Sequence, residues 1–479
     1  MHKSFPRRTL VPVVALSLAT FLDAQAKPGE SVAAVVVTPT APAVSTGEMY
    51  IVNHETNTAT KLTLPAALVN ERTNCVTMMG GPLGFVGTNP IQPAAPPFVP
   101  GNIYQITIAG TVVTATQLNT TPAAGPNVAQ IALVGGKLYF VSQNASNTGG
   151  VLQSVSMGGG PVTTEVDLAT VSGAVGLGNA LCAIGTKVYV ACFDSGATAT
   201  TGSVVVYDTT TSTASVLTQL PKGKYVSGTS TFNTGIVHAQ APASMPGKLL
   251  LIGVYGDVLV MDAANGNVLQ HTFSGAIGAT STTVNLLNSG DWDPITEDVI
   301  VGSRDGWVER IVSGHAAEKV VPGVGSSATA SQNSVVGLAH IPANAGADVT
   351  SGAGCPGFGG YTLTDVGRGV PVAGNGAFQM ACYSGDGGNN AVLVIGVTNP
   401  GLDLSVIGMT NCILRSSLDV TIPTVLTGTG AGLGKATIPF PIPAGVSGTI
   451  CRQWVEVQAP GRTTNPLGLV LSNGRKTAL

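Results

Sequence analysis

The sequence has few charged and few aromatic residues. Of 479 residues, 9% are charged and 5% are aromatic, and 21 Lys and Arg stand against 24 Asp and Glu. Proteins that bind nucleic acid usually present a basic stripe interleaved with aromatic residues, so we expect no nucleic-acid partner. Disorder is also not expected, because 44% of the residues are hydrophobic and can form a core.

Long apolar runs are missing beyond the N-terminus, so we expect no transmembrane span in the mature chain. The N-terminus itself has the three parts of an export signal. Lys3, Arg7 and Arg8 precede the apolar stretch "TLVPVVALSLATFL", and Ala24 and Ala26 form an A-x-A site. We therefore predict a signal peptide at residues 1–26, cleavage near Ala26, and a secreted or cell-surface protein, in a compartment where disulfide bonds persist.

Several catalytic and nucleotide-binding motifs are also missing. The sequence has no G-x-S-x-G in a strand-to-helix context, no P-loop, and no G-x-G-x-x-G in a βαβ unit. We therefore expect no cofactor, and the sequence does not settle whether the protein is an enzyme.

A repeat of about 50 residues runs through the first 350 positions. Six segments begin with Gly and place apolar residues two and five positions later, with spacings of 49 to 54 residues: they start at Gly47, Gly101, Gly150, Gly202, Gly256 and Gly306. Hairpin turns such as Gly135-Gly136 and Asn265-Gly266 flank them. The predicted fold is all-β: a six-bladed β-propeller at 47–349, after a linker at 27–46. We expect the strand "SVVGLAHIP" (Ser334–Pro342) to close the ring on "EMYIVN" (Glu48–Asn53).

The blade pattern of "YDTTTSTASVL" and "MDAANGNVL" resembles that of secreted bacterial propellers with quinoprotein-like or NHL-like repeats. The resemblance covers about 300 residues. It implies the fold and leaves the function open.

The pattern changes near Ser351, where short alternating strands are separated by Gly, Pro and Asn clusters. A C-terminal β-sandwich at 351–479 is the predicted architecture. The segments "GAGCPGFGG", "NCIL" and "IPFPIPAGVSGTICRQWV" resemble a tail domain (GCPGxGG type) of planctomycete secreted proteins. The resemblance implies a role in attachment or export.

Four of the seven cysteines, Cys355, Cys382, Cys412 and Cys451, lie in this tail. Four cysteines allow three pairings, and a zinc site would need C-x(2–4)-C spacings that they lack. The tail resemblance favours a Cys355–Cys412 disulfide, and Cys382 and Cys451 would then form the second one. Cys382 and Cys451 are additional to the cysteine pair of the family pattern. In the propeller, the hairpin register places Cys182 and Cys192 on opposite faces of one sheet, so we expect both in the core.

The window "SGDWDPITEDVIVGSRDGW" (Ser289–Trp307) is unusually acidic. It does not fit a calcium loop, because Ile295 and Thr296 stand where an oxygen ligand and a Gly are needed. We interpret its carboxylates mainly as turn residues, with a hairpin turn at Asp305-Gly306. The alternative is a ligand or metal carboxylate.

His238 and His340 lie on predicted first strands, which line the channel of a propeller. With Asp291 they are weak candidates for a metal site, and the ordinary alternative is hydrogen-bonded core histidines. His54 and His315 are expected on surface hairpins.

The favoured function is an exported, non-catalytic binding or scaffold protein that acts through the propeller face. Its partner would be an extracellular ligand or an envelope component, and the tail would serve attachment or export. The alternative is a propeller hydrolase or lyase with a channel-bound metal held by His238, His340 and Asp291.

Overall fold

The computed structural model describes 30–38, 45–54, 56–80, 82–90, 98–123, 125–144, 149–175, 177–193, 202–227, 230–233, 235–242, 245–273, 287–293, 298–311, 318–321, 324–327, 332–341, 347–459 and 461–479. The predicted signal peptide and His315 lie outside these ranges, as does most of the proline-rich loop after Asn89. No helix in the described ranges is long and apolar enough to cross a membrane.

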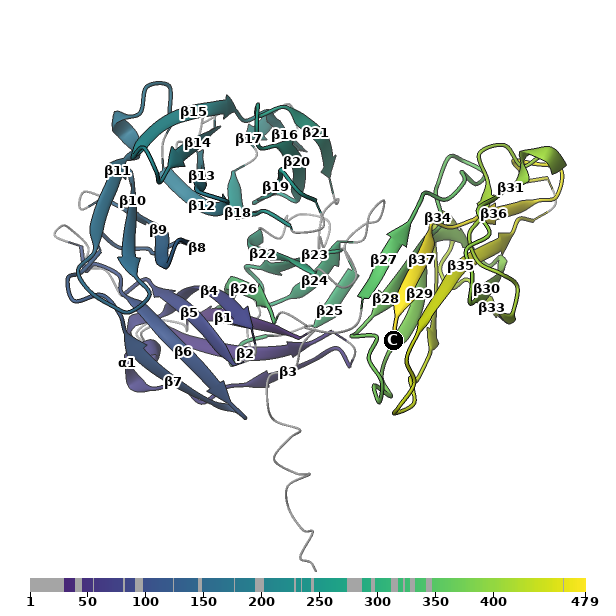
Figure 1. Ribbon diagram of the computed structural model, residues 1–479, viewed down its shortest axis with the longest axis horizontal. Helices are drawn as coiled ribbons and strands as arrows, with labels where there is room; N and C mark the ends of the chain where they lie inside the picture. Colours follow the sequence, from purple (N-terminus) through teal and green to yellow (C-terminus); the bar gives the residue numbers. More distant parts are fainter. Residues whose placement is uncertain are drawn as a thin grey trace, which may run out of the picture.

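Six four-stranded antiparallel sheets in the described part form a β-propeller, which confirms the predicted fold (Figure 1). Blade I contains β26 (Asn333–His340), β1 (Ser31–Val37), β2 (Thr46–Asn53) and β3 (Thr58–Lys61). Blade II contains β4 (Thr73–Gly80), β5 (Leu83–Thr88), β6 (Ile103–Ala109) and β7 (Val112–Gln117). Blade III contains β8 (Ile131–Val134), β9 (Lys137–Gln143), β10 (Gly150–Ser156) and β11 (Thr163–Asp167).

The other three blades follow in chain order. Blade IV contains β12 (Leu177–Ile184), β13 (Lys187–Phe193), β14 (Gly202–Asp208) and β15 (Thr213–Gln219). Blade V contains β18 (Ile236–Gln240), β19 (Lys248–Gly253), β20 (Asp257–Asp262) and β21 (Val268–Phe273). Blade VI contains β22 (Leu287–Asp293), β23 (Asp298–Ser303), β24 (Val308–Ile311) and β25 (Glu318–Val321).

The two ends of the propeller segment meet in blade I and close the ring. The blade contains one strand, β1, that the sequence analysis did not predict. β26 pairs with β1, not with β2, and β1 then pairs with β2. The linker prediction for 27–46 is therefore wrong over Ser31–Val37. This run, "SVAAVVV", is almost fully buried. Its apolar residues do not alternate with polar ones, because both faces of the strand are covered.

The hairpin predictions inside the blades are confirmed. Gly135 and Gly136 take positive φ angles of 56° and 81° at the β8–β9 turn. In blade IV, Cys182 pairs with Tyr189, and Cys182 and Cys192 belong to separate apolar clusters. Both are free, buried thiols, because side chains on opposite faces of a sheet are too far apart for a disulfide.

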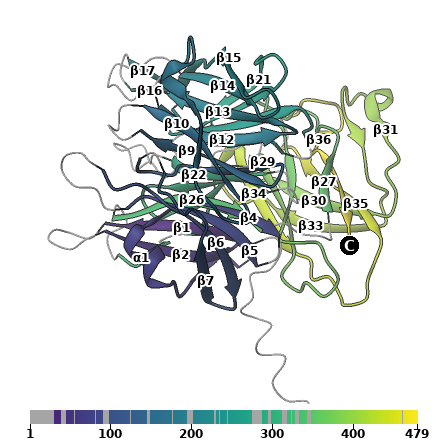
Figure 2. The ribbon, with the colours of Figure 1, turned by 60° about the vertical axis from the view of Figure 1, so that its left-hand side comes forward.

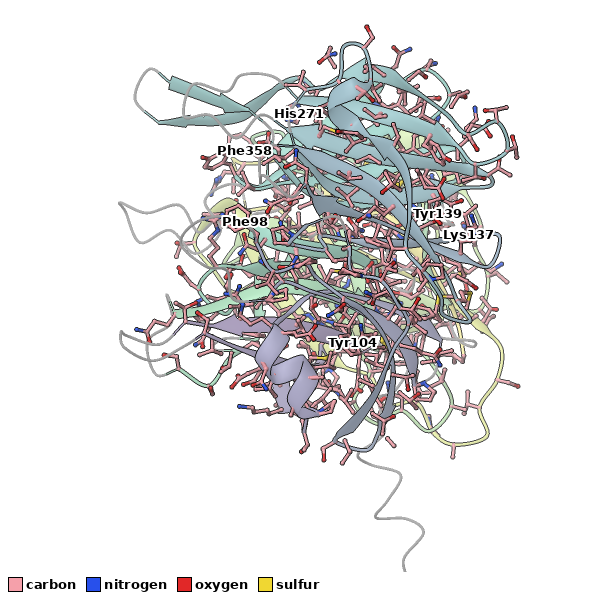
Figure 3. All side chains as sticks on the ribbon, turned by 90° about the vertical axis from the view of Figure 1, so that its left-hand side faces the viewer. Phe98, Tyr104, Lys137, Tyr139, His271 and Phe358 are labelled. Atoms are coloured by element: carbon pink, nitrogen blue, oxygen red, sulfur yellow. A yellow bond between two sulfur atoms is a disulfide. The ribbon has the colours of Figure 1, made fainter. Side chains whose placement is uncertain are left out.

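Two additions interrupt the blade repeat. Helix α1 (Ala66–Glu71) connects blades I and II. The hydroxyl of Tyr104 on β6, which Figure 3 labels, donates a 2.8 Å hydrogen bond to Glu71 at the end of the helix. A hairpin, β16 (Lys222–Ser227) and β17 (Ser230–Asn233), lies between blades IV and V in the chain.

The tail lies beside the ring, next to blades VI and I (Figures 1 and 2). Its larger sheet has six strands: β27 (Ala347–Ser351), β37 (Gly474–Ala478), β35 (Thr449–Val457), β30 (Asn390–Gly396), β33 (Val420–Val425) and β36 (Leu469–Leu471). The smaller one has three: β28 (Thr364–Arg368), β29 (Gln379–Gly387) and β34 (Gly430–Pro439). Met380 of the small sheet and Leu393 and Trp454 of the large sheet share one core. A β-sandwich stays the prediction for the tail as a whole.

The tail contains the predicted Cys355–Cys412 disulfide. The Cys382–Cys451 pairing is wrong, because both are free, buried thiols. Cys382 lies on β29 of the small sheet and Cys451 on β35 of the large sheet. Cys382 is fully buried within the shared core, where a free thiol behaves as a small apolar group.

Candidate functional site

The innermost strands of the six blades surround a cavity of about 420 Å³ in the propeller channel. Its lining comes from β4, β8, β12, β18, β22 and β26 and the residues next to them. Each inner strand is a sheet edge, so half of its backbone N–H and C=O groups have no neighbouring strand to pair with. These backbone groups need other hydrogen-bond partners, and polar side chains in the channel supply some of them.

Side chains bridge the inner edges of successive blades. Thr77 donates to the Ile131 carbonyl at 3.0 Å. The Gln130 side chain accepts from the backbone N–H of both Leu181 and Ala239 at 3.1 Å, and donates to the Ala239 carbonyl at 2.7 Å. Gln130 thus connects blade III with blades IV and V, a role that the sequence pattern does not indicate.

The bridging continues from blade V to blade I. Gln240 accepts from the Trp292 N–H at 2.6 Å. Asp291 accepts from the His340 N–H with Oδ2 and from the Trp292 N–H, at 2.8 Å, with Oδ1. Both oxygens of Asp291 are therefore used to hold backbone, which is a structural role for this candidate metal ligand.

Burial raises the pKa of the Asp291 carboxyl to about 6, although the backbone N–H groups of His340 and Trp292 act in the opposite direction. Burial lowers the pKa of His238 to about 4, against a hydrogen bond to Gln240. His238 is therefore a neutral imidazole at pH 7.

The structure brings His238, His340 and Asp291 to the lining of one cavity. In the part of the chain that the structure describes, no three His, Cys, Asp or Glu side chains are grouped so as to hold a metal ion. The sequence thus located the channel correctly through these residues, and the arrangement gives no support to the metal-dependent alternative.

The acidic window contains a buried ionic cluster that the turn interpretation missed. Asp293 and Asp298 are 3% and 4% exposed, and Arg310, 1% exposed, lies between them. Arg310 Nη1 is 2.6 Å from Asp298 Oδ2, and Arg310 Nη2 is 3.7 Å from Asp293 Oδ2. Burial opposes the charge on Arg310, yet Asp298 and Asp293 hold its pKa above the usual value.

Two histidines lie close to this cluster. His340 Nε2 is 3.7 Å from Asp293 Oδ1. His54 was expected on the surface but is 2% exposed, with Nε2 2.8 Å from the Ser31 hydroxyl. Burial and the nearby Arg310 charge lower the pKa of His54 to about 3. The cluster therefore ties blade VI to blade I.

The end of the acidic window follows the prediction. Asp305 and Gly306 form the turn between β23 and β24, and Gly306 has φ 72°. Pro294–Glu297 lie outside the described residues. The turn interpretation is thus confirmed for Asp305 and wrong for the three aspartates at 291, 293 and 298.

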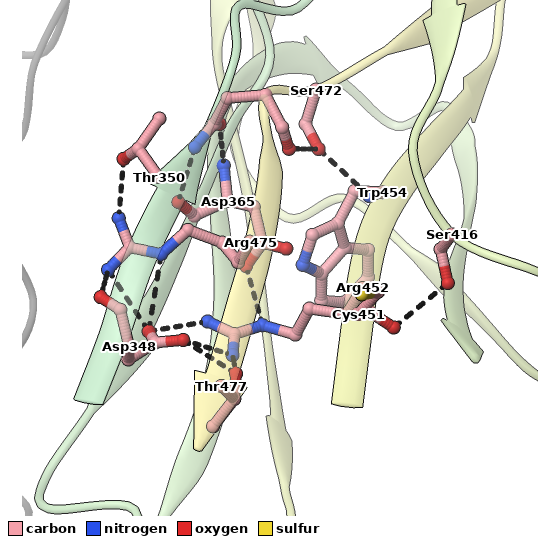
Figure 4. A network of polar contacts seen from close by, with 11 residues as sticks. Asp348, Thr350, Asp365, Ser416, Cys451, Arg452, Trp454, Ser472, Arg475 and Thr477 are labelled. Carbon is pink, nitrogen blue, oxygen red and sulfur yellow. Dashed lines mark hydrogen bonds and ion pairs between the residues drawn. The ribbon is translucent and has the colours of Figure 1, made fainter. Parts of the chain in front are cut away.

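A second buried ionic network lies in the tail (Figure 4). Arg452 donates from Nη1 and Nη2 to both oxygens of Asp348, at 2.6 and 2.7 Å, and from Nε to Asp365 at 3.0 Å. Arg475 Nη2 is 3.1 Å from Asp348, and Thr477 donates to Asp348 at 2.7 Å. The network joins β27, β28, β35 and β37 and is fully buried, so its role is structural.

Comparisons with known proteins identify no family for this chain. No known family model matches the sequence, and no curated protein matches it. The chain is similar to the Dos1 propeller structure at 14% identity, with a TM-score of 0.34, over 55% of this chain and 64% of that one. It is similar to the Neurospora crassa Pan2 WD40 domain at 13% identity, TM-score 0.32, over 53% and 66%, and to the RRP9 WD40 repeats at 12% identity, TM-score 0.33, over 52% and 63%. The chain thus spans less than two thirds of each of these structures.

Proposed function

We propose that this chain is an exported, non-catalytic binding protein whose propeller binds an extracellular partner and whose tail attaches it to the cell envelope. The observation that carries the proposal is an uneven distribution of exposed apolar side chains. Seventeen large apolar side chains are exposed in the described part of the chain, and twelve of them lie beyond residue 350.

Five of these twelve lie between residues 397 and 418, a stretch that we call the tail tip: Val397, Leu402, Val406, Ile407 and Leu418. Val406 is 86% exposed on the short helix η3 (Leu404–Ile407). Within this stretch, β31 (Leu402–Asp403) lies at the end of the tail farthest from the ring (Figures 1 and 2). Concentrated apolar surface on a water-soluble domain typically marks an interaction site.

The tail tip is held in place by its surroundings. Cys412 is bonded to Cys355, and Met409 and Leu471 pack with both in one buried cluster. An apolar surface on a fixed support binds without first ordering the chain, which suits an attachment role.

The channel supports a binding role over a catalytic one. Its carboxylate Asp291 and the amides Gln130 and Gln240 are engaged with backbone groups. If these side chains acted in catalysis instead, the hydrogen bonds that connect neighbouring blades would be lost. β1 begins at Ser31, so cleavage near Ala26 would leave the first blade complete.

Cell fractionation tests the attachment role in the full chain. We expect Val406→Ser/Ile407→Ser to shift most of the protein from the envelope to the soluble extracellular fraction. The matched control Val112→Ser/Leu269→Ser removes two exposed apolar residues of the propeller and should fractionate like the wild type. Equal envelope binding by both double variants would refute attachment through the tail tip.

Export is tested separately by N-terminal sequencing of the mature protein. We expect the sequence to begin at Lys27. Intact Met1 on protein confined to the cytoplasm would refute export.

A further inference from the structure

A second cavity, of about 620 Å³, lies where the tail meets blade VI. Asp298 of β23 lines it from the propeller, and the rest of its lining belongs to the tail. Its volume lies within the range of about 300–1,000 Å³ that is usual for small-molecule sites. None of the lining residues belongs to the tail tip, so any role of this cavity is separate from the attachment proposed above.

The charged groups of the lining are buried and already paired. Asp298, Asp365 and Arg475 are buried, and each forms an ion pair with another buried side chain. Figure 4 shows the pairs of the two tail residues. A charged ligand would therefore meet no accessible opposite charge in the described lining.

The accessible part of the lining is polar or has no side chain. The lining residues that are exposed or half-buried are all Gly, Thr, Ala, Asn or Tyr, whereas the apolar lining residues Leu363 and Val366 are buried. Glycine allows a ligand to approach backbone N–H and C=O groups closely, and threonine hydroxyls both donate and accept. This surface fits an uncharged ligand that carries many hydroxyl groups.

An exposed aromatic ring lies in the turn that borders this cavity. Among the exposed large apolar side chains of the described chain, Phe358, which Figure 3 labels, is the only aromatic one, and it is 40% exposed. Its turn is tied by hydrogen bonds from the Gly357 N–H to the Tyr361 carbonyl, at 2.7 Å, and from the Gly360 N–H to the Gly357 carbonyl, at 2.9 Å. Gly360 and Tyr361 of this turn line the cavity, so the ring is presented beside it on a fixed support.

The ring of Phe358 also has an oriented cationic neighbour. The Arg462 guanidinium carbon lies 5.3 Å from the ring centroid, and Arg462 is paired with Asp386 at 3.0 Å. The face of an aromatic ring carries negative charge, which attracts a guanidinium group and also the weakly positive C–H groups of a sugar ring. Sugars combine such a C–H face with hydroxyl groups, which are the two chemistries that this region offers.

We propose that the tail binds an uncharged oligosaccharide at this cavity. One sugar unit lies in the cavity, where its hydroxyl groups form hydrogen bonds with the exposed Thr362 side chain and with the backbone of Gly352 and Ala353, which are also exposed. A neighbouring unit places the C–H face of its ring on Phe358.

Calorimetric titration of the full mature chain tests the proposal. The probes are four uncharged oligosaccharides, cellopentaose, laminaripentaose, maltopentaose and chitopentaose, and one charged oligosaccharide, a pentamer of galacturonic acid. We expect at least one uncharged probe to bind with a Kd below about 1 mM, and the galacturonic acid pentamer to bind at least about tenfold more weakly than that probe.

Variants assign the contacts. Phe358→Ala should weaken binding about tenfold, and Phe358→Tyr, which keeps the ring, should bind within about twofold of the wild type. Thr362→Val, which removes one accessible hydroxyl, should weaken binding about fivefold. The tail-tip variant Val406→Ser/Ile407→Ser should bind the probes like the wild type, so this site and the attachment role fail or stand separately.

Three results would overturn the proposal: no saturation by any uncharged probe up to about 10 mM, equal affinity for the galacturonic acid pentamer, or unchanged affinity in Phe358→Ala. The first two are read on the wild type, so the test does not depend on the folding of a variant.

Discussion

The propeller and the tail each contain a buried aspartate, Asp291 and Asp348, and the pKa values of the two carboxyl groups shift in opposite directions. Asp291 in the channel is 8% exposed and accepts hydrogen bonds from backbone N–H groups; burial raises its pKa to about 6. Asp348 in the tail is 0% exposed. Burial would raise its pKa as well, but Arg452 and Arg475 hold it far below the usual range.

The difference shows what compensates a buried charge. At Asp291, neutral N–H donors do not fully replace the water that the carboxylate loses, whereas at Asp348 two guanidinium groups outweigh burial. Asp365 shares Arg452 with Asp348, and burial still raises its pKa to about 6. The tail thus combines a disulfide with a buried ionic network. The propeller combines the buried Arg310 cluster with many side-chain-to-backbone bonds around the ring.

The largest effect is expected from Asp348→Ala. The change leaves Arg452 and Arg475 buried without their main acceptor, and such losses cost about 3–5 kcal/mol. Urea unfolding followed by Trp454, which lies in the tail core, measures it in a Trp292→Phe/Trp307→Phe background.

Thr350→Ala is the control for this prediction. It removes the 2.9 Å bond from Arg475 Nη1, worth about 1 kcal/mol. If both variants unfold at the same urea concentration, the ionic network does not stabilise the tail as the structure indicates.

A somewhat smaller effect is expected from Cys355→Ser/Cys412→Ser. The bond joins residues 57 apart in sequence, and losing it should cost the tail about 2–4 kcal/mol. The unfolding transition of the propeller should not move. Wild-type protein with a reductant should behave like the variant.

Thiol counting checks the pairing behind this prediction. Unfolding without reductant followed by alkylation should label five thiols of seven: Cys75, Cys182, Cys192, Cys382 and Cys451. Three labelled thiols would mean that a second disulfide exists and that the tail has a further covalent support.

The smallest effect concerns pH and Asp291. Its folded pKa of about 6 lies above the unfolded value of about 3.9, so between these values the folded state binds more protons than the unfolded state. The contribution of Asp291 to stability is thus present below pH 4 and is lost as the pH rises to 6.

Between pH 4 and 6 the Asp291 carboxyl should make the free energy of unfolding of the propeller fall by at most about 1.4 kcal/mol per pH unit. Urea unfolding at several pH values should show that Asp291→Asn removes this slope. Asp305→Asn, in the half-buried hairpin turn, serves as the control and should keep the wild-type slope. An unchanged slope in Asp291→Asn would show that the backbone N–H groups compensate the charge after all.

Features set by neighbouring residues could be predicted from the sequence. The Asp305-Gly306 turn and the Cys182–Tyr189 register follow from turn chemistry and the two-residue period of a strand. The candidate site was found only in part. His238, His340 and Asp291 were placed in the channel, but Gln130, Gln240 and Trp292 were not singled out, because an amide or indole in a strand carries no signal of its own.

The acidic window shows the limit most clearly. The sequence predicts Asp293 and Asp298 to be turn residues, since acidic residues beside Pro and Gly usually are. Their burial depends on Arg310, which lies on the next strand, and on His340, which arrives from the last strand of the ring.

The sequence by itself determined the number of blades and the hairpin registers, because repeats and turns are local properties of the chain. The Cys355–Cys412 pair was implied by the resemblance of the tail motifs. Only the tertiary structure decided that β1 completes blade I, that Cys382 and Cys451 stay apart, and that three aspartates are buried. Each of these depends on contacts between segments distant in the chain, and burial, unlike turn formation, is fixed by what the rest of the fold brings alongside.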